Sequence, residues 1–291
     1  MGRLTPANAA ATASTAARSG RRRWLQLPLH VALVGPAWAQ LQSGDRPEAS
    51  PVWLKVRASL FESRTIISPG EAVIRLEAPL RAEDAAVVPI AIHSPISQTA
   101  ARWVRKVYLI IDNNPSPISA IFEFSPASGS ADIETRVRID EYTFVRAIAE
   151  LSDGTLHMST RYVKAAGGCS APPGKDPQAA AASLGRMRLN VDGTVRRGES
   201  VLAQLMISHP NSSGMAMDQS TRQYTPAHYV RRVAVTYAGE PVLTADLDFA
   251  ISENPNFRFY FVPRGDGDLR AEVLDSNDLR FETVLKYRRS D

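Results

Sequence analysis

Short runs of alternating apolar and polar residues make up most of the first half of the chain. A period of two is typical of strands that bury one face, and residues that favour turns separate the runs. This pattern predicts seven strands in the first half, at 72–77, 87–93, 104–111, 118–124, 133–139, 143–151 and 156–163.

Before these strands, the segment 50–63 has a different period. Its large apolar residues Trp53, Val56, Leu60 and Phe61 follow the spacing of a helix that buries one side. We therefore expect a helix here, packed across one end of the strands.

The second half repeats the strand pattern. We expect turns at Asp192-Gly193, Ala238-Gly239 and Gly265-Asp266-Gly267, because Gly and Asp favour tight turns. Seven short strands in about 100 residues are typical of an immunoglobulin-like sandwich, although periodicity alone also allows a closed barrel. The fold class is therefore all-β, with one sandwich in each half. The strands of the second half are expected at 186–191, 200–207, 229–237, 241–249, 257–262, 268–274 and 280–287.

Residues 166–183 lack the period of two and are rich in Gly, Pro and Ala. This composition is typical of a linker. A short alanine-rich helix over 177–184 is also compatible, because Pro177 suits the first helical position. In both cases we expect separate sandwich domains at 50–165 and 184–291.

Residues 1–39 contain five arginines and no acidic residue, followed by a short apolar run and Ala37-Trp38-Ala39. This layout is typical of a signal peptide that is cleaved on export. The segment Arg21-Arg22-Arg23-Trp24-Leu25 is similar to a twin-arginine export box, and the general secretory route is the alternative. The apolar run is too short to span a membrane. We expect a mature periplasmic protein that begins near Gln40.

Removal of residues 1–39 changes the charge of the chain. The remaining residues include 29 Lys and Arg and 30 Asp and Glu, so the expected mature protein is nearly neutral. It has no basic stripe with interleaved aromatic residues, which argues against binding of nucleic acid.

Cys169 is the only cysteine, and it lies among Gly167, Gly168, Ser170 and two prolines. A structural cysteine usually has apolar neighbours, whereas an unpaired cysteine in an exported protein suggests a reactive thiol or an intermolecular disulfide. We expect an accessible thiol on an arm whose flexibility comes from Gly167 and Gly168. No neighbouring residue clearly activates this thiol.

Other candidates for chemistry are weaker. The histidines at 93, 157, 209 and 228 show no spacing typical of a metal site, and we expect structural or surface roles for them. Met215 and Met217 have no third soft ligand nearby, so we expect them to pack within a loop. The sequence indicates no metal and no cofactor.

Several motifs give the chain a resemblance to a fused SoxY-SoxZ sulfur carrier. The first half resembles SoxY at 78–90 and at 162–169, which ends Gly167-Gly168-Cys169. The second half resembles SoxZ at 208–210, 225–230, 237–242 and 252–259, the last of which reads Ser-Glu-Asn-Pro-Asn-Phe-Arg-Phe.

The resemblance implies a periplasmic carrier, not an enzyme, whose Cys169 binds sulfur intermediates covalently. The implied partners are a c-type cytochrome, a sulfohydrolase or components of a quinoprotein dehydrogenase system, and the cargo is an inorganic sulfur species. The alternative is a non-catalytic adaptor of such a dehydrogenase or its cytochrome, in which Cys169 is incidental. A thiol oxidoreductase is disfavoured, because a second cysteine that could resolve a disulfide is missing.

The chain departs from the family pattern in two places. In separate SoxY subunits the cysteine lies close to a free C-terminus, whereas here the chain continues into the second half. After His209-Pro210 the chain reads Asn211-Ser212-Ser213-Gly214, where the family has a run similar to Met-Glu-Thr-Gly. We therefore expect an arm tethered at both ends and an altered surface for partners, with thiosulfate in doubt as the natural cargo.

Overall fold

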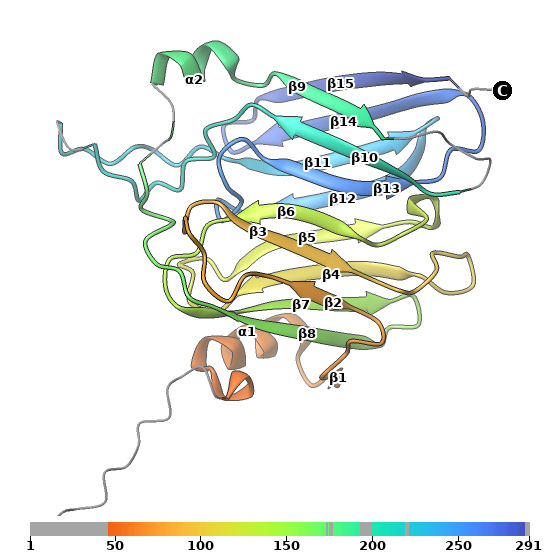
Figure 1. Cartoon of the computed structure of the whole chain (residues 1–291), viewed down its shortest axis with the longest axis horizontal. Helices are drawn as coiled ribbons and strands as arrows, with labels where there is room; N and C mark the ends of the chain where they lie inside the picture. Colours follow the sequence, from red (N-terminus) through yellow and green to blue (C-terminus); the bar gives the residue numbers. More distant parts are fainter. Residues whose placement is uncertain (1–45, 173, 175–176, 193–198, 219–220, 289–291) are drawn as a thin grey trace, which may run out of the picture. The chain divides into compact units, whose positions relative to one another are not determined.

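The computed structural model describes residues 46–172, 174, 177–192, 199–218 and 221–288 (Figure 1). The expected signal peptide, Gly193 of one expected turn and several linker residues lie outside the described residues. The helical elements are η1 (Pro47–Ala49), α1 (Pro51–Phe61), η2 (Pro126–Ser128) and α2 (Pro177–Ser183). None of the described helices is long and apolar enough to cross a membrane.

The described residues of the first half form eight strands: β1 (Ile66–Ile67), β2 (Arg75–Glu77), β3 (Val88–His93), β4 (Val104–Ile111), β5 (Ile118–Phe124), β6 (Ile133–Val137), β7 (Thr143–Leu151) and β8 (Leu156–Val163). Those of the second half form seven: β9 (Met187–Val191), β10 (Val201–Ile207), β11 (Val230–Tyr237), β12 (Glu240–Leu247), β13 (Asn256–Phe261), β14 (Gly267–Asp275) and β15 (Arg280–Tyr287). The all-β prediction is confirmed, and β4, β5, β7, β8 and β15 have the predicted bounds.

The strands form two sheets that pack face to face over one hydrophobic core. The larger sheet has the order β1-β8-β7-β4-β5-β12-β11-β14-β15, and the smaller has the order β2-β3-β6-β13-β10-β9. Each half of the chain contributes neighbouring strands to both sheets, so each half is a two-layered sandwich, as predicted.

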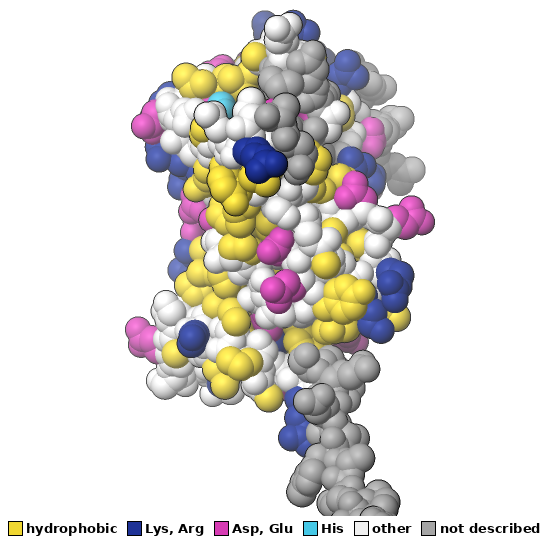
Figure 2. Space-filling view, turned by 90° about the vertical axis from the view of Figure 1, so that its left-hand side faces the viewer, with side chains coloured by type: hydrophobic (Ala, Val, Ile, Leu, Met, Phe, Trp, Pro, Cys, Tyr) yellow, Lys and Arg dark blue, Asp and Glu magenta, His cyan; other side chains and the backbone are white. Residues whose placement is uncertain are grey.

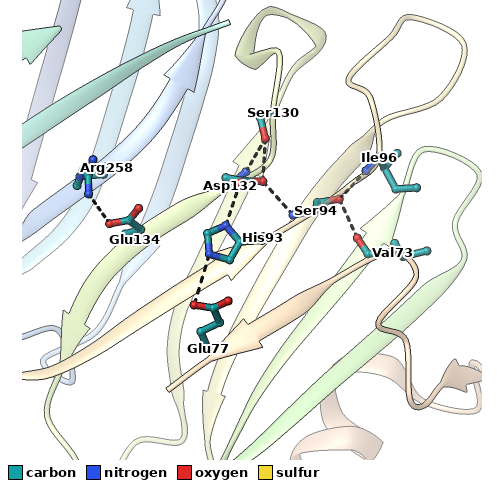
Figure 3. Close-up of polar contacts among 9 residues, drawn as sticks. All are labelled: Val73, Glu77, His93, Ser94, Ile96, Ser130, Asp132, Glu134 and Arg258. Atoms are coloured by element: carbon teal, nitrogen blue, oxygen red, sulfur yellow. Dashed lines mark hydrogen bonds and ion pairs between the residues drawn. The ribbon is translucent and has the colours of Figure 1, made fainter. Parts of the chain in front are cut away.

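The two sandwiches are not separate units, because both sheets continue from one half into the other. In the larger sheet β5 pairs with β12, where Phe124 lies opposite Leu243. In the smaller sheet β6 pairs with β13, and Glu134 forms a 2.9 Å ion pair with Arg258 across this junction (Figure 3). Backbone hydrogen bonds therefore join the two predicted sandwiches edge to edge.

Helix α1 forms as predicted, but it covers a sheet face and not an end of the strands. Ser50 caps the helix by accepting a hydrogen bond from the Trp53 N–H, and Pro51 suits the first helical turn. Trp53 and Phe61 pack in a second hydrophobic cluster with residues of β4, β7 and β8. Strand β7 is consequently buried on both faces, towards the main core and towards α1.

Five segments, most of which carry predicted motifs, meet at one end of the sandwich, on the left of Figure 1, whereas the motif at 237–242 lies at the opposite end. They are the loop before β3, the loop between β6 and β7, the segment after β8, the long connection between β10 and β11 and the loop between β12 and β13. Backbone and side-chain hydrogen bonds link them, including Lys164 N–H to Leu80 O and Ser252 Oγ to Ala86 O. This end of the molecule contains Cys169.

Candidate functional site

The segment that carries Cys169 leaves β8 and packs against the first half of the chain. The Gly167 N–H donates to Asp140 O at 2.8 Å, and the Gly168 N–H donates to Ile139 O at 2.9 Å. Both acceptors lie in the loop between β6 and β7. Main-chain hydrogen bonds thus hold the two residues before Cys169 in a defined position.

The two glycines serve different purposes in this conformation. Gly167 has φ of +80°, which favours glycine, and open space surrounds the position of a Cβ. At Gly168 a Cβ would lie 2.0 Å from Ala85 O and 2.7 Å from Ile139 O. Gly168 therefore allows a close approach of three backbone segments, and arm flexibility remains a prediction.

Cys169 is buried, with 1% of its surface exposed. The expectation of an accessible thiol is thus wrong for this conformation. The sequence suggested a segment that could not pack, because two glycines precede the cysteine and Ser170, Ala171 and two prolines follow it. Small residues instead let the chain lie flat against Ala85 and Ile139, and the second half of the chain covers it.

The cover comes from the connection between β10 and β11. The Ser213 hydroxyl, itself buried, donates to the carbonyl oxygen of Cys169. Further along, the Gly174 N–H donates to Glu253 Oε2 at 2.8 Å. The arm is therefore tethered at both ends, as expected, and in addition contacts the SoxZ-like motifs around Ser213 and Glu253.

The surroundings of Cys169 favour the neutral thiol. Burial has the largest effect on its pKa, the Asp140 and Asp248 carboxylates act in the same direction, and the Arg138 guanidinium opposes them only in part. Together these effects raise the pKa of Cys169 to about 12. In this closed conformation the thiol is neither ionised nor accessible, which makes it a poor nucleophile.

Arg138 is the buried cation beside this site. Its Nη1 donates to the carbonyl oxygens of Asn211, Ile251 and Phe249, at 2.6, 3.0 and 3.4 Å. No carboxylate among the described residues forms an ion pair with it, and burial lowers its pKa. Arg138 lies in the first half and all three acceptors lie in the second, so this side chain joins the halves next to Cys169.

Two of the weaker candidates, His209 and His228, come together around a residue that the sequence did not single out. His228 Nε2 lies 2.7 Å and His209 Nε2 lies 3.4 Å from Oδ2 of the buried Asp275. The other carboxylate oxygen accepts the N–H groups of Asn277 and Leu279 at 2.8 Å. Burial alone would raise the pKa of Asp275, but these hydrogen bonds outweigh it and the pKa is lowered.

The possible ligand atoms of His209, His228 and Asp275 lie within 4.8 Å of one another, as a metal site requires. However, His209 Nδ1 accepts the Asn211 N–H at 3.1 Å, which places the proton of the neutral ring on Nε2, facing Asp275. A metal ion there would have to displace this proton. The geometry therefore favours a hydrogen-bonded cluster with a structural role.

The two other histidine candidates lie away from the cysteine. His93 Nδ1 lies 2.9 Å from Asp132 Oδ2, and its Nε2 lies 3.9 Å from Glu77, on the outer face of the smaller sheet (Figure 3). His157 lies on β8, where burial lowers its pKa. Met217 lies on the protruding connection between β10 and β11 and is 39% exposed, so it is only loosely packed.

Sequence reasoning missed Arg138, Ser213 and Asp275. Ser213 had a signal, because it lies in the run after His209-Pro210 that departs from the family pattern. Arg138 and Asp275 had none, since the carbonyl groups that Arg138 contacts and the two histidines that contact Asp275 lie more than 40 residues away in the chain.

The comparisons with known proteins agree with this architecture. The model of the family "Sulfur oxidation protein SoxY" matches residues 57–169 and therefore ends at Cys169, and the model of "Sulphur oxidation protein SoxZ" matches residues 188–286. The comparison with curated proteins found no match.

Several solved structures are similar to parts of the chain. The sulfur carrier protein SoxY from Chlorobium limicola f thiosulfatophilum is 22% identical, with 39% of this chain and 91% of that chain covered and a TM-score of 0.32. A superoxide reductase (neelaredoxin) from Ignicoccus hospitalis is 16% identical, with 34% and 93% covered and a TM-score of 0.31. A beta-glycosidase from Bacteroides vulgatus is 10% identical, with 74% and 24% covered and a TM-score of 0.21.

The two family models match successive parts of the chain and together cover most of it. Their boundary falls between β8 and β9, where the structure places the cysteine segment and α2. The chain therefore belongs to the SoxY and SoxZ families, joined in one polypeptide as a fused SoxYZ-like sulfur carrier.

Proposed function

We propose that Cys169 of this carrier binds sulfur intermediates covalently in the periplasm and presents them to partner redox enzymes and hydrolases. The observation that carries the proposal is the position of the only cysteine. Cys169 ends the SoxY match and lies on the segment that leaves β8, which is held mainly by main-chain contacts. Such a segment can leave its site without disturbing either sheet.

The chemistry at Cys169 requires a partner. Attachment of thiosulfate forms a bond between Cys169 Sγ and the outer sulfur of thiosulfate, and it releases the thiol proton and two electrons. A c-type cytochrome or a component of a quinoprotein dehydrogenase system would accept these electrons, and a sulfohydrolase would release sulfate from the resulting S-thiosulfonate. A persulfide is the other adduct that we expect. Burial keeps the thiol neutral in the closed segment, so the active site of the partner would supply the activation.

The surface around the cysteine segment suits such partners. Figure 2 shows hydrophobic side chains on this end of the molecule, interrupted by acidic ones. Large exposed hydrophobic residues lie on segments that meet here, which supports docking of another protein. They are Leu80, Tyr142, Met217 and Tyr224, at 65%, 49%, 39% and 65% exposure.

Intact-mass spectrometry tests the proposal. Protein isolated from the periplasm should carry mass additions that a reductant removes. Purified protein should gain the same additions when it is incubated with thiosulfate, sulfide or polysulfide and a cell fraction that contains electron-accepting partners. These additions should map to Cys169 and be missing from Cys169→Ser. If no adduct forms under any sulfur-supplying condition, the carrier function is wrong.

The burial of Cys169 favours one alternative, a non-catalytic adaptor of a quinoprotein dehydrogenase or its cytochrome in which the thiol is incidental. Cys169→Ser distinguishes the two. The adaptor retains its function with serine at this position, whereas the carrier loses it completely.

A further inference from the structure

The closed cysteine segment makes few contacts through its own side chains. Main-chain hydrogen bonds to Asp140 and Ile139 hold Gly167 and Gly168, and one hydroxyl, that of Ser213, holds the Cys169 carbonyl. A neutral hydrogen bond of this kind contributes about 0.5–1.5 kcal/mol. The segment is therefore held firmly enough to bury a thiol but weakly enough to be released.

The site leaves little space for anything larger than a thiol. Gly168 is wedged between Ala85 O and Ile139 O, so the main chain cannot move deeper. The Cys169 side chain is already 1% exposed, and protein interiors are packed about as densely as organic crystals. A sulfonate-bearing adduct on Sγ would have to displace its neighbours or move the segment outwards.

The charges around Cys169 also oppose a bulky anionic adduct, as the lack of space does. Both carboxylates that influence Cys169, Asp140 and Asp248, oppose a negative charge there. Asp248 Oδ1 is buried without a hydrogen-bond partner among the described residues, and burial raises the pKa of this carboxyl. Among the described residues, Arg138 is the cation that acts on Cys169, and its Nη1 already donates to three carbonyl groups. An anionic adduct would thus lose its hydration beside two carboxylates.

The loop that provides Ser213 has a firm anchor of its own. The Asn211 N–H donates to His209, and the Asn211 side chain donates to Ile251 O at 2.7 Å and accepts the Val230 N–H at 2.9 Å. Ser212 pairs with His228 through two main-chain hydrogen bonds. Because the loop is fixed, it is the cysteine segment that moves when the contact between Ser213 and Cys169 breaks.

We propose that the cysteine segment is a latch controlled by cargo. The free thiol closes against Ala85, Ile139 and Ser213, and an anionic sulfur adduct on Cys169 releases the segment to solvent. Partners would then meet an extended segment on the loaded carrier and a withdrawn one on the empty carrier. The release step rests on the proposed function of Cys169, but the closed state of the free thiol does not.

The closed state is tested on the free thiol alone, by the rate at which iodoacetamide alkylates Cys169 in the folded full chain. Ser213→Ala removes one hydrogen bond to the segment, so we expect a rate 5- to 10-fold faster, which corresponds to about 1 kcal/mol. Ser170→Ala is the matched control, because the Ser170 hydroxyl bonds only within the segment, to Gly167 O at 3.3 Å. Equal alkylation rates for the wild type and both variants would show that the Ser213 hydroxyl does not keep the segment closed.

The release step is tested by hydrogen exchange of the Gly167 and Gly168 amides in three forms of the protein. Tetrathionate converts the Cys169 thiolate into the S-thiosulfonate and releases thiosulfate, without any further oxidant. Methyl methanethiosulfonate provides a neutral S-methylthio adduct and releases methanesulfinate. We expect exchange at least 10-fold faster in the S-thiosulfonate than in the free thiol, with the neutral adduct in between.

Unchanged protection of both amides after loading would overturn the latch. Failure of the proposed function would give different results from failure of the latch. If native protein never carries sulfur but Ser213→Ala accelerates alkylation and the S-thiosulfonate loses protection, the latch stands and the natural cargo must be sought elsewhere.

Discussion

Two buried groups, the Asp275 carboxylate and the Cys169 thiol, lie close together at one end of this molecule but differ in how their charge and hydrogen bonding are satisfied. Asp275 is completely buried but accepts hydrogen bonds from two histidines and two main-chain N–H groups. Cys169 is as deeply buried, yet only its carbonyl accepts a hydrogen bond and its thiol stays neutral. The first arrangement fixes a loop, and the second leaves a segment that can be released.

The loop from His209 to Ser213 connects these two sites. At one end His209 belongs to the Asp275 cluster, and at the other Ser213 contacts the cysteine segment. Hydrogen bonds to a charged group contribute about 1.5–3 kcal/mol each, roughly twice as much as neutral ones. The comparison therefore teaches that the second half of the fused chain provides a rigid loop, against which the cysteine segment opens and closes in the proposed latch.

Replacing the central carboxylate should have the largest effect. Asp275→Asn keeps the size of the side chain but turns an NH₂ group towards the donor nitrogens of His209 or His228, or towards main-chain N–H groups. We expect a loss of about 3–5 kcal/mol in the free energy of unfolding, measured by urea denaturation. The matched control is Asp278→Asn, because Asp278 forms an exposed ion pair with Arg231 and should change stability by less than about 0.5 kcal/mol. Equal losses in the two variants would refute a special role of the cluster.

Acid should weaken the same support. Burial, followed by the neighbouring His228, lowers the pKa of His209 from its ordinary 6.5 to about 4. The unfolded state therefore binds a proton more readily than the folded state, so stability is complete above about pH 6.5 and falls as the pH decreases towards 4. We expect a loss of about 3 kcal/mol over this window.

The measurement is the free energy of unfolding against pH for wild type, His209→Gln and His93→Gln. His209→Gln should lack most of the slope between pH 6.5 and 4. His93, which is partly exposed on the smaller sheet, provides the control and should leave the slope intact. The same slope in all three proteins would exclude His209 as its source.

Gly168→Ala should release the cysteine segment from its closed position. The added methyl group would lie 2.0 Å from Ala85 O, so the closed segment cannot re-form, whereas both sheets are untouched. We expect alkylation of Cys169 to become at least about 100-fold faster, with at most about 2 kcal/mol lost in stability. Gly265→Ala is the control, because nothing lies within 4 Å of its added methyl group. A rate unchanged from wild type would mean that the segment does not close at Gly168.

Local pattern was sufficient to predict the strands. Turn residues follow β4, β5 and β7, so even the bounds of these strands were predictable. The Ala238-Gly239 turn also forms as expected, with both residues at positive φ. The two-residue strand β1 was missed, because two residues are too few to show a period.

Contacts between distant residues were not predictable. Strand β5 alternates in the same way whether its edge is free or paired, so nothing in Ile118–Phe124 indicates that β12 lies beside it. The burial of Cys169 likewise depends on Ala85, Ile139 and Ser213 and not on its own neighbours in the chain. The cluster at His209 required Asp275, which is 66 residues away.

The most direct test of the account is the alkylation rate of Cys169 in the folded wild-type chain, compared with the rate in urea and with the rate of global unfolding. A closed but releasable segment predicts a rate about 10²- to 10⁴-fold slower than in the unfolded chain, yet still faster than global unfolding. If the thiol reacts only as fast as the protein unfolds, Cys169 is a structural core residue and the carrier account is contradicted. If it reacts as fast as in urea, the closed segment does not exist in solution.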